Sequence, residues 1–501
     1  MRAIVIGSGF GGLASAIRLR AAGHEVTVLE RLDQPGGRAY VFKQDGFTFD
    51  AGPTIITAPA LIEELFALSG RRMSDYVTLA PVDPFYNVRF EDGSVFSYGS
   101  DRAAVERQVE SWNPGDLQGY RRFAAEAERI FAAGFPLIDK SFTRLRDMLR
   151  VLPALVRLRA DRSVARVVER NISDPRLRQV FGFHPLLIGG NPFDTTSVYA
   201  MIHALERRWG VWFAMGGTGA LVRALARLLT DTGGLLRLGS GVAEILVDAG
   251  TRRATGVRLS SGEVIAADVV VSNADVATTY TTMIPQRVRR RNTDARYRRM
   301  RYSMSLFVLY FGTNRKYENM AHHEILMGPR YEGLLNDIFR GRPLPRDFSL
   351  YLHRPTATDA SLAPDGCDAF YALAPVPNLR SPTDWASAGR PYRDAIVGYL
   401  EERYMPGLSS AIVTERVVDP RYFRDTLGAR LGSAFSVEPV LAQSAWFRPH
   451  NRSEDISNLY FAGAGTHPGA GLPGVISSGK IVADLVAEDA ARATPSFAGA
   501  R

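Results

Sequence analysis

The spacing of apolar residues changes twice within the first 30 positions of the chain. Residues 2–6 form an apolar run, which is typical of a strand buried in a parallel sheet. Apolar side chains then recur on one side of a predicted helix over residues 13–22, and Gly23 ends that pattern. A second apolar run covers residues 25–29. This order predicts a strand, a helix and a second parallel strand at the start of the chain.

The same patterns predict the elements that follow. Helices are expected over residues 60–69, 117–132, 198–209 and 220–229. A hairpin over residues 88–98 turns at Asp92-Gly93. Residues 236–273 contain consecutive strands that return to the first sheet, and a second, smaller sheet is expected from residues 305–312, 348–353 and 369–374. A last strand enters a glycine cluster, and a helix begins near Pro473, a residue that suits a first helical turn.

The loop after the first strand carries Gly7, Gly9, Gly11 and Gly12, which include the G-x-G-x-x-G spacing. Gly7 permits a tight turn, Gly9 lets the backbone approach a pyrophosphate, and Gly12 lets the helix pack closely on the strand. The free N–H groups and the dipole of the helix start favour phosphate. Glu30 ends the second strand, where its carboxylate can accept from ribose hydroxyls and would repel a 2′-phosphate. Together these features predict a dinucleotide-binding unit.

Two further glycine-rich segments bear on whether the dinucleotide is FAD or NAD. Gly36, Gly37 and Arg38 lie just past the second strand, and a long extended cofactor needs close backbone and a cation there, which favours FAD. An ordinary loop is the alternative. The N–H groups of the last helix can stabilise negative charge on a reduced flavin. Further cofactor-binding positions are expected in the returning strand and in the C-terminal glycine cluster: Val242, Gly463, Gly465, Pro473, Gly474 and Val475.

These elements predict an α/β protein that starts and ends on its cofactor. A Rossmann-like FAD-binding domain is expected from residues 1–75, 220–285 and 435–490. An inserted α+β substrate domain, with a helical membrane-associating segment, is expected from residues 76–219 and 286–434. Residues 491–501 are expected to form a flexible tail. A chain of 501 residues is long enough for two or more domains.

Composition narrows the compartment and the partners. No apolar run reaches the about 18 residues of a membrane span, and the N-terminus is already a strand, so neither a spanning helix nor a signal peptide is expected. A single cysteine, Cys367, excludes an internal disulfide and fits a reducing, cytoplasmic compartment. The net charge of +9 favours an anionic partner. Because no nucleic-acid motif occurs, an anionic membrane surface is preferred over nucleic acid.

Residues 141–170 form a strongly basic segment, since arginines there far outnumber acids. Its apolar residues recur at helical spacing, although Pro153 is expected to kink or divide the helix. Those residues are Leu145, Met148, Leu149, Leu152 and Val156. A basic amphipathic helix can lie in a membrane interface. The alternative is a solvated basic face above a stripe of core residues.

Several longer motifs are more specific than the glycine spacing. They are residues 35–40 (PGGRAY), 49–54 (FDAGPT), 189–193 (GGNPF), 205–212 (LERRWGVW), 446–451 (WFRPHN) and the glycine cluster 463–474. With these motifs the chain, from Gly7 to about residue 485, resembles bacterial carotenoid desaturases of the phytoene desaturase type, within the flavin amine oxidase-like superfamily.

The resemblance implies an enzyme that uses FAD, acts on the long polyene precursor phytoene and attaches peripherally to the inner face of the cell membrane. Within the family the chain is most similar to enzymes that carry phytoene through to lycopene, with oxygen or a quinone as the final electron acceptor. Forming a C=C bond in an alkane-like segment removes a hydride and a proton, and a flavin takes the hydride because no side chain can. Asp147 matches a position where the family carries an acidic residue near the substrate, and Arg150 lies beside it; a surface salt bridge is the alternative.

Other functions stay open at this point. Desaturation in fewer steps to neurosporene, another carotenoid desaturase, a saturase or an isomerase would carry the same motifs. A flavin amine oxidase and a non-enzymatic, prenyl-binding relative of the fold are further alternatives. The eight histidines show no ligand spacing, so no metal site is expected.

Overall fold

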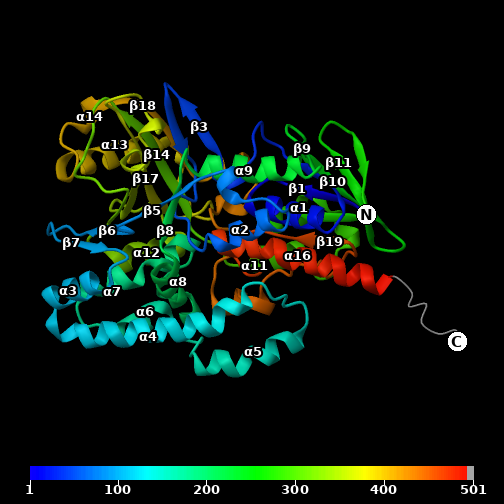
Figure 1. The fold of residues 1–501 in the computed structure, drawn as a ribbon, viewed down its shortest axis with the longest axis horizontal. Coiled ribbons are helices and arrows are strands. Elements are labelled where there is room, and N and C mark those ends of the chain that lie inside the picture. The colour runs from blue at the N-terminus through cyan, green and yellow to red at the C-terminus, as the bar shows by residue number, and fades with distance from the viewer. Residues whose placement is uncertain (494–501) are drawn as a thin grey trace.

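The computed structural model describes residues 1–493 and contains a five-stranded parallel sheet (Figure 1). The strand order is β19-β13-β1-β2-β9, and every neighbouring pair runs parallel. The strands are β1 (Arg2–Ile6), β2 (Glu25–Leu29), β9 (Leu235–Arg237), β13 (Val269–Ser272) and β19 (Leu459–Phe461). The two strands predicted at the N-terminus are confirmed. Apolar runs of this kind are typical of parallel strands that are covered on both faces of the sheet.

Alternate residues of β1 supply two separate cores. Ala3 and Val5 pack against the helices on one face, and Ile4 and Ile6 pack on the other face. Side chains of a strand point alternately to opposite faces, which is why one run can serve both. The helices are α1 (Phe10–Ala21), α2 (Ala60–Ala67), α9 (Thr218–Asp231) and α16 (Leu472–Ala493). The other face is covered by an antiparallel sheet of β10 (Val242–Asp248), β11 (Arg253–Leu259) and β12 (Val264–Ala266).

The second large sheet has seven strands in the order β18-β14-β17-β16-β15-β6-β7, and only β15 and β6 pair in parallel. The expectation of a smaller second sheet is therefore wrong. Its three predicted strands and the hairpin at Asp92-Gly93 are present, but β15 and β18 were missed because β15 is short and β18 carries charged residues. The strands are β6 (Tyr86–Arg89), β7 (Val95–Tyr98), β14 (Ser305–Thr313), β15 (His323–Leu326), β16 (Leu350–His353), β17 (Asp368–Val376) and β18 (Ile412–Val418).

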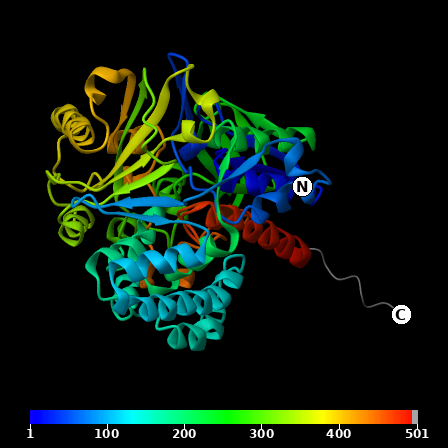
Figure 2. The ribbon, with the colours of Figure 1, turned by 60° about the vertical axis from the view of Figure 1, so that its left-hand side comes forward.

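Helices cover both faces of the seven-stranded sheet. Helix α13 (Trp385–Arg403) packs on one face through Trp385, Tyr392 and Ile396. A group of helices gathers on the other side, shown in cyan and green in Figures 1 and 2. These are α3 (Arg102–Trp112), α4 (Leu117–Gly134), α5 (Leu145–Arg157), α6 (Val164–Glu169), α7 (Pro175–Gly182) and α8 (Met201–Trp209).

Helix α5 forms the outer edge of this group (Figure 1) and runs through Pro153 without division. The expected division of the helix at Pro153 is therefore wrong. A proline inside a helix removes one hydrogen bond and costs about 3 kcal/mol. Val151, Ala154 and Leu155, on either side of it, line the cavity described below.

The strands of the parallel sheet all come from the three segments expected to bind the cofactor, although other parts of those segments join the second core. The hairpin of β3 (Val41–Gln44) and β4 (Phe47–Asp50) buries Phe42, Phe47 and Phe49 against the seven-stranded sheet. The domain boundaries therefore stay a prediction. At the C-terminus, residues 491–493 belong to α16 and not to a tail; residues 494–501 lie outside the described residues.

Candidate active site

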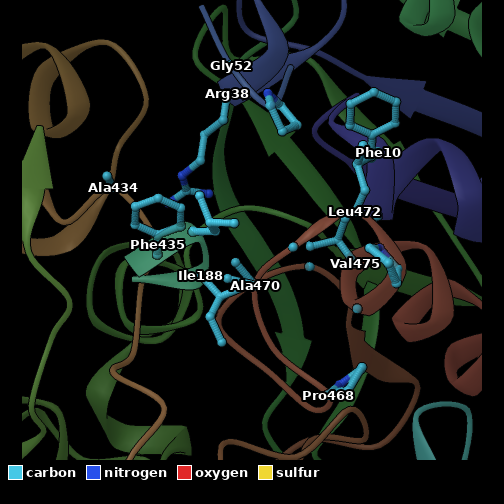
Figure 3. Close-up of a pocket in the computed structure, with 18 of the residues that line it drawn as sticks. Phe10, Arg38, Gly52, Ile188, Ala434, Phe435, Pro468, Ala470, Leu472 and Val475 are labelled. Carbon is cyan, nitrogen blue, oxygen red and sulfur yellow. The ribbon is translucent and has the colours of Figure 1, made fainter. Parts of the chain in front are cut away.

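A cavity of about 600 Å³ lies where the glycine-rich loops meet the apolar faces of the second sheet and its helices. Figure 3 shows part of its lining: Phe10, Leu472 and Val475 lie on one side, and Ile188, Ala434 and Phe435 lie on the other. Arg38 reaches from the N-terminal half toward Phe435. The cavity thus joins the parts of the chain that were expected to bind cofactor and substrate.

The N-terminal loop leaves no room for side chains. A Cβ at Gly12 would overlap the carbonyl oxygen of Gly7, and a Cβ at Gly11 would lie 2.6 Å from the Asn273 Oδ1 atom. A Cβ at Gly9 would lie 2.9 Å from Asn273 Nδ2. Gly7, Gly9 and Gly11 line the cavity, whereas Gly12 does not. The loop is therefore kept narrow at the cavity wall, directly before the N-terminus of α1.

Glu30 is held in place by three donors. Its Oε2 accepts from the backbone N–H of Ser8 at 2.8 Å and from the Ser8 hydroxyl at 2.6 Å, and its Oε1 accepts from Leu32 N–H at 3.0 Å. The carboxylate is buried and lines the cavity. A carboxylate has about four acceptor sites, so one stays free for a ligand hydroxyl.

Arg38 is a half-buried cation whose buried Nε is an unused donor. Gly36 and Gly37, which precede it, have φ angles of 129° and 57°, values that side chains disfavour. Burial lowers the pKa of Arg38, an effect that nearby Asp275 partly offsets. Its Nε has no hydrogen-bond partner among the described residues, and the side chain lines the cavity. A buried, unpaired donor is costly, so this atom fits an acceptor on a bound anionic or flavin group.

The C-terminal glycine cluster faces the same space. Gly463, with φ 99°, would place a Cβ 2.7 Å from Asn273 Oδ1, and its N–H donates to Ser478 Oγ at 2.8 Å. Pro473, Gly474 and Val475, in the first turn of α16, line the cavity, as do Gly463 and Val242. Gly465 does not line it; a Cβ there would lie 2.8 Å from Val276 Cγ1, so this glycine serves packing.

Arg448, which sequence reasoning did not single out beyond its motif, fixes the shape of that cluster. The guanidinium is buried and donates from Nη2 to the carbonyls of Ala464 at 2.7 Å and Val437 at 2.9 Å, and from Nε to Thr466 O at 3.1 Å. Asn451 of the same motif donates to His467 O at 2.8 Å. The motif at residues 446–451 therefore holds the backbone that faces the cofactor side of the cavity.

The structure fits FAD on these observations. The narrow glycine loops leave space that a Cβ would fill, Glu30 offers a free acceptor, Arg38 offers a free donor, and the N-termini of α1 and α16 both point positive potential at the cavity. The residues that would hold FAD are Gly7, Gly9, Gly11, Glu30, Gly37, Arg38, Gly463 and Gly474.

Most of the remaining lining is apolar. It comes from α5, from the segment around residues 183–188, from α8 and from the second sheet. The residues include Met148, Val151, Leu155, Phe183, Leu186, Leu187, Met304, Leu306, Val308, Ile325, Met327 and Leu350. Such a wall suits a ligand without hydrogen-bonding groups.

Comparison with known proteins agrees with this site. Residues 10–487 match the family of flavin-containing amine oxidoreductases. The chain belongs to this family. A phytoene desaturase (lycopene-forming) of Pseudescherichia vulneris is 54% identical, over 97% of this chain and 99% of that protein. A phytoene desaturase (lycopene-forming) of Pantoea ananas is 52% identical, over 97% of this chain and 99% of that protein. A phytoene desaturase (neurosporene-forming) of Cereibacter sphaeroides is 47% identical, over 98% of this chain and 95% of that protein.

Solved structures share the fold at low sequence identity. Cyclohexylamine oxidase from Brevibacterium oxydans is 16% identical, with a TM-score of 0.63 and coverage of 98% of this chain and 99% of that chain. An oxidoreductase from Methanosarcina mazei is 19% identical, with a TM-score of 0.63 and coverage of 97% and 100%. The resemblance to bacterial phytoene desaturases, the α/β fold with its Rossmann-like unit and the use of a flavin are thereby confirmed.

Asp147 and Arg150 do not reach the cavity. The Asp147 carboxylate accepts from the Arg144 N–H at 3.0 Å and so caps α5, and Arg150 is exposed. Met148 and Val151, one position further along, line the cavity instead. Residues three apart share a helix face, and here that face is not the one turned inward. A catalytic role for these two residues stays a prediction without support from their position.

The structure brings together three histidines that no sequence spacing indicated. One nitrogen of each of His322, His323 and His353 lies within 4.8 Å of the others, because β15 and β16 pair His323 with His353. All three are buried, and burial lowers their pKa values, that of His322 to about 3, so they are neutral at pH 7. Neutral imidazoles can bind a metal ion, but the positive charge of Arg354 acts on His322.

Proposed function

We propose that the protein is an FAD-dependent desaturase that introduces successive C=C bonds into phytoene and forms mainly lycopene. The observation that carries the proposal is a cavity with a flavin-binding side and a long apolar side, in a chain 54% identical to a lycopene-forming phytoene desaturase. The relative from Cereibacter sphaeroides, 47% identical, is named for neurosporene, so the shorter reaction is the second candidate.

The residues have distinct parts in this reaction. Bound FAD would supply the oxidant that accepts a hydride. The glycine loops, Glu30 and Arg38 would orient it against the apolar wall. That wall would hold a segment of the polyene and exclude water, so that a single C–C unit is presented to the flavin. Oxygen or a quinone would accept the electrons afterwards.

We also propose that α5 is the port through which the substrate leaves the membrane. Its outer face exposes Leu145, Leu149, Leu152 and Val156, with exposed fractions from 45% to 68%. Its inner face contributes Met148, Val151 and Leu155 to the cavity wall. One helix therefore has apolar residues on both the solvent side and the cavity side, and exposed arginines lie between them.

Peripheral attachment at the inner face of the cell membrane would suit such a port. None of the helices between residues 1 and 493 is long and apolar enough to cross a bilayer. The exposed apolar side chains could enter the interface while Arg144, Arg146, Arg150 and Arg157 contact anionic head groups.

Expression in a host that makes phytoene, followed by pigment identification, tests the substrate and the product. Red lycopene as the main pigment is expected. Neurosporene as the end product would support the shorter reaction. Unchanged phytoene in the presence of folded, FAD-loaded protein would contradict the proposal. Anaerobic assays with and without an added quinone would distinguish the two acceptors.

A further inference from the structure

A few buried polar side chains interrupt the apolar wall of the cavity. A polyene offers them no hydrogen bond, so each polar group that faces it costs free energy unless it is paired within the protein. Thr54, Tyr351 and Tyr371 satisfy one another: Thr54 Oγ1 lies 2.6 Å from the Tyr371 hydroxyl and 3.0 Å from the Tyr351 hydroxyl. Glu206, on α8, is not satisfied in this way.

The Glu206 carboxylate has one free oxygen. The residue is fully buried and lines the cavity. Its Oε1 accepts from the Tyr86 hydroxyl at 2.7 Å. Its Oε2 lies 3.2 Å from His184 Nε2, but neither atom makes a hydrogen bond of acceptable geometry within the described residues. A carboxylate oxygen and an imidazole nitrogen thus face each other at the cavity wall, close enough to exchange a proton after a small rotation.

Other carboxylates at the cavity are differently placed. Glu30 accepts from Ser8 and Leu32 in the cofactor-binding loop. Asp275 accepts from Thr278 N–H at 3.1 Å and from Ser436 Oγ at 2.9 Å. Asp147 lies outside the lining. Among the carboxylates of residues 1–493 that line the cavity, Glu206 is therefore the one that belongs to the apolar side.

We propose that Glu206 takes the proton in each desaturation step, an inference that rests on the proposed function. Bound FAD would accept the hydrogen of one substrate C–H bond together with its bonding electron pair. The neighbouring C–H bond gives its proton to Glu206 Oε2 and leaves its electron pair as the new C=C bond. The proton stays on Glu206 while the flavin is reduced. It passes to His184 Nε2 when oxygen or a quinone reoxidises the flavin, which closes the balance.

Groups behind Glu206 support this role for His184. The His184 ring stacks on Phe183, with ring centroids 4.5 Å apart, and meets the rings of Tyr98 and His203. The Tyr98 hydroxyl is 2.8 Å from His203 Nδ1, and burial lowers the pKa of His203, so that imidazole is neutral. The imidazole that His184 meets on this side therefore carries no charge. Arg207, on α8 like Glu206, is a cation whose charge also acts to lower the pKa values of His203 and Tyr98.

The decisive variant is Glu206→Gln, which keeps the shape and can still accept from Tyr86. In FAD-loaded enzyme on phytoene-containing liposomes, the rate of flavin reduction should fall at least about 100-fold, the usual worth of a general base. FAD content and Tm should match the wild type. Reduced-minus-oxidised infrared spectra should show a protonated carboxyl band in the wild type that is missing in the variant.

Glu324→Gln is the matched control, because Glu324 is equally buried and lies outside the cavity lining, where it pairs with Arg89. It should lower Tm without changing the rate of flavin reduction. A Glu206→Gln enzyme within threefold of the wild-type rate would overturn the role of Glu206. Wild-type enzyme that leaves phytoene unchanged would instead contradict the proposed function.

A second variant keeps the proposal falsifiable if Glu206→Gln does not fold. Tyr86→Phe removes the donor to Glu206 Oε1 but leaves the carboxylate, so the carboxylate should become more basic. The fall of the reduction rate at low pH should then move to higher pH. A merely structural role for Tyr86 and Glu206 would leave that part of the pH profile where it is.

Discussion

The flavin-binding side of the cavity and its apolar side are built by different means. On the flavin side, Gly11, Gly12 and Gly463 are packed against backbone or Asn273, and Glu30 has three fixed donors. On the apolar side, α5 has no fully buried residue, and four of its large apolar side chains are exposed. The first side leaves almost no freedom for substitution, whereas the second depends on a helix with one face on the cavity and one on the surroundings. Precise positioning suits a cofactor that stays bound, and an exposed apolar helix suits a substrate that binds and is released in each reaction cycle.

The largest effect is expected at Gly12. In Gly12→Ala the new Cβ would overlap the Gly7 carbonyl oxygen, which is backbone and cannot rotate away. We expect the purified protein to lose nearly all FAD and much of its stability. In Gly9→Ala the Cβ would meet the Asn273 amide group, a side chain that can shift, so part of the flavin should remain. Flavin absorbance and Tm of both variants measure the difference, and equal flavin contents would contradict the packing argument.

The next effect is expected on the other side, at α5. Reversing the charge of Arg150 and Arg157, in α5, and of Arg159, just after it, should weaken binding to anionic liposomes about a hundredfold or more, at ~1 kcal/mol for each basic residue near the surface. Flotation at low and high salt measures this, and salt should weaken wild-type binding as well. Reversing Arg290, Arg298 and Arg299, three exposed arginines outside α5, is the control. Unchanged flotation of the α5 variant would remove the helix as the port. The aromatic stretch at residues 209–213 is a poor substitute, because Val211 and Phe213 are buried.

Glu30→Gln should have a smaller effect, again on the flavin side. The variant loses the charge that Ser8 and Leu32 support, and charge-assisted hydrogen bonds are worth about 1.5–3 kcal/mol, so FAD affinity should fall roughly 10- to 100-fold. Titration of the apoprotein with FAD measures it. Glu25→Gln, at the exposed start of the same strand, should bind FAD like the wild type. Full affinity in Glu30→Gln would mean that the cofactor does not use this acceptor.

The smallest effect concerns acid and the second sheet. The pKa of His322 is lowered to about 3 by burial, against about 6.5 in the unfolded chain, so its stabilising contribution is complete above pH 6.5 and is lost as pH falls toward 3. Between pH 6.5 and 5.5 this amounts to about 1 kcal/mol. Between pH 6.5 and 5.5, the unfolding free energy of His322→Gln should therefore fall by about 1 kcal/mol less than that of the wild type. Denaturant titration at the two pH values measures the difference. His24→Gln, just beyond the end of α1, should differ less from the wild type, because this partly exposed ring is buried less deeply than His322.

The sequence by itself determined the flavin-binding side of the molecule. The strand at residues 2–6, the glycines after it, the second strand and Glu30 follow one another directly, so period and loop chemistry could place them with no knowledge of distant contacts. The motifs around Gly36 and Gly463 were found in the same way. Here local order and tertiary position coincide, because a βαβ unit is completed within about 30 residues.

The tertiary structure alone decided the apolar side. Helical periodicity showed that residues 145–156 are amphipathic, but only the position of the helix beside the cavity determined that Met148 and Val151 turn inward and Asp147 does not. His323 meets His353 through the pairing of two strands. Glu206 meets Tyr86, which lies 120 residues earlier in the chain, and also His184. These partners are far apart in sequence and carry no shared spacing. Their meeting depends on the packing of whole elements, which no local pattern encodes.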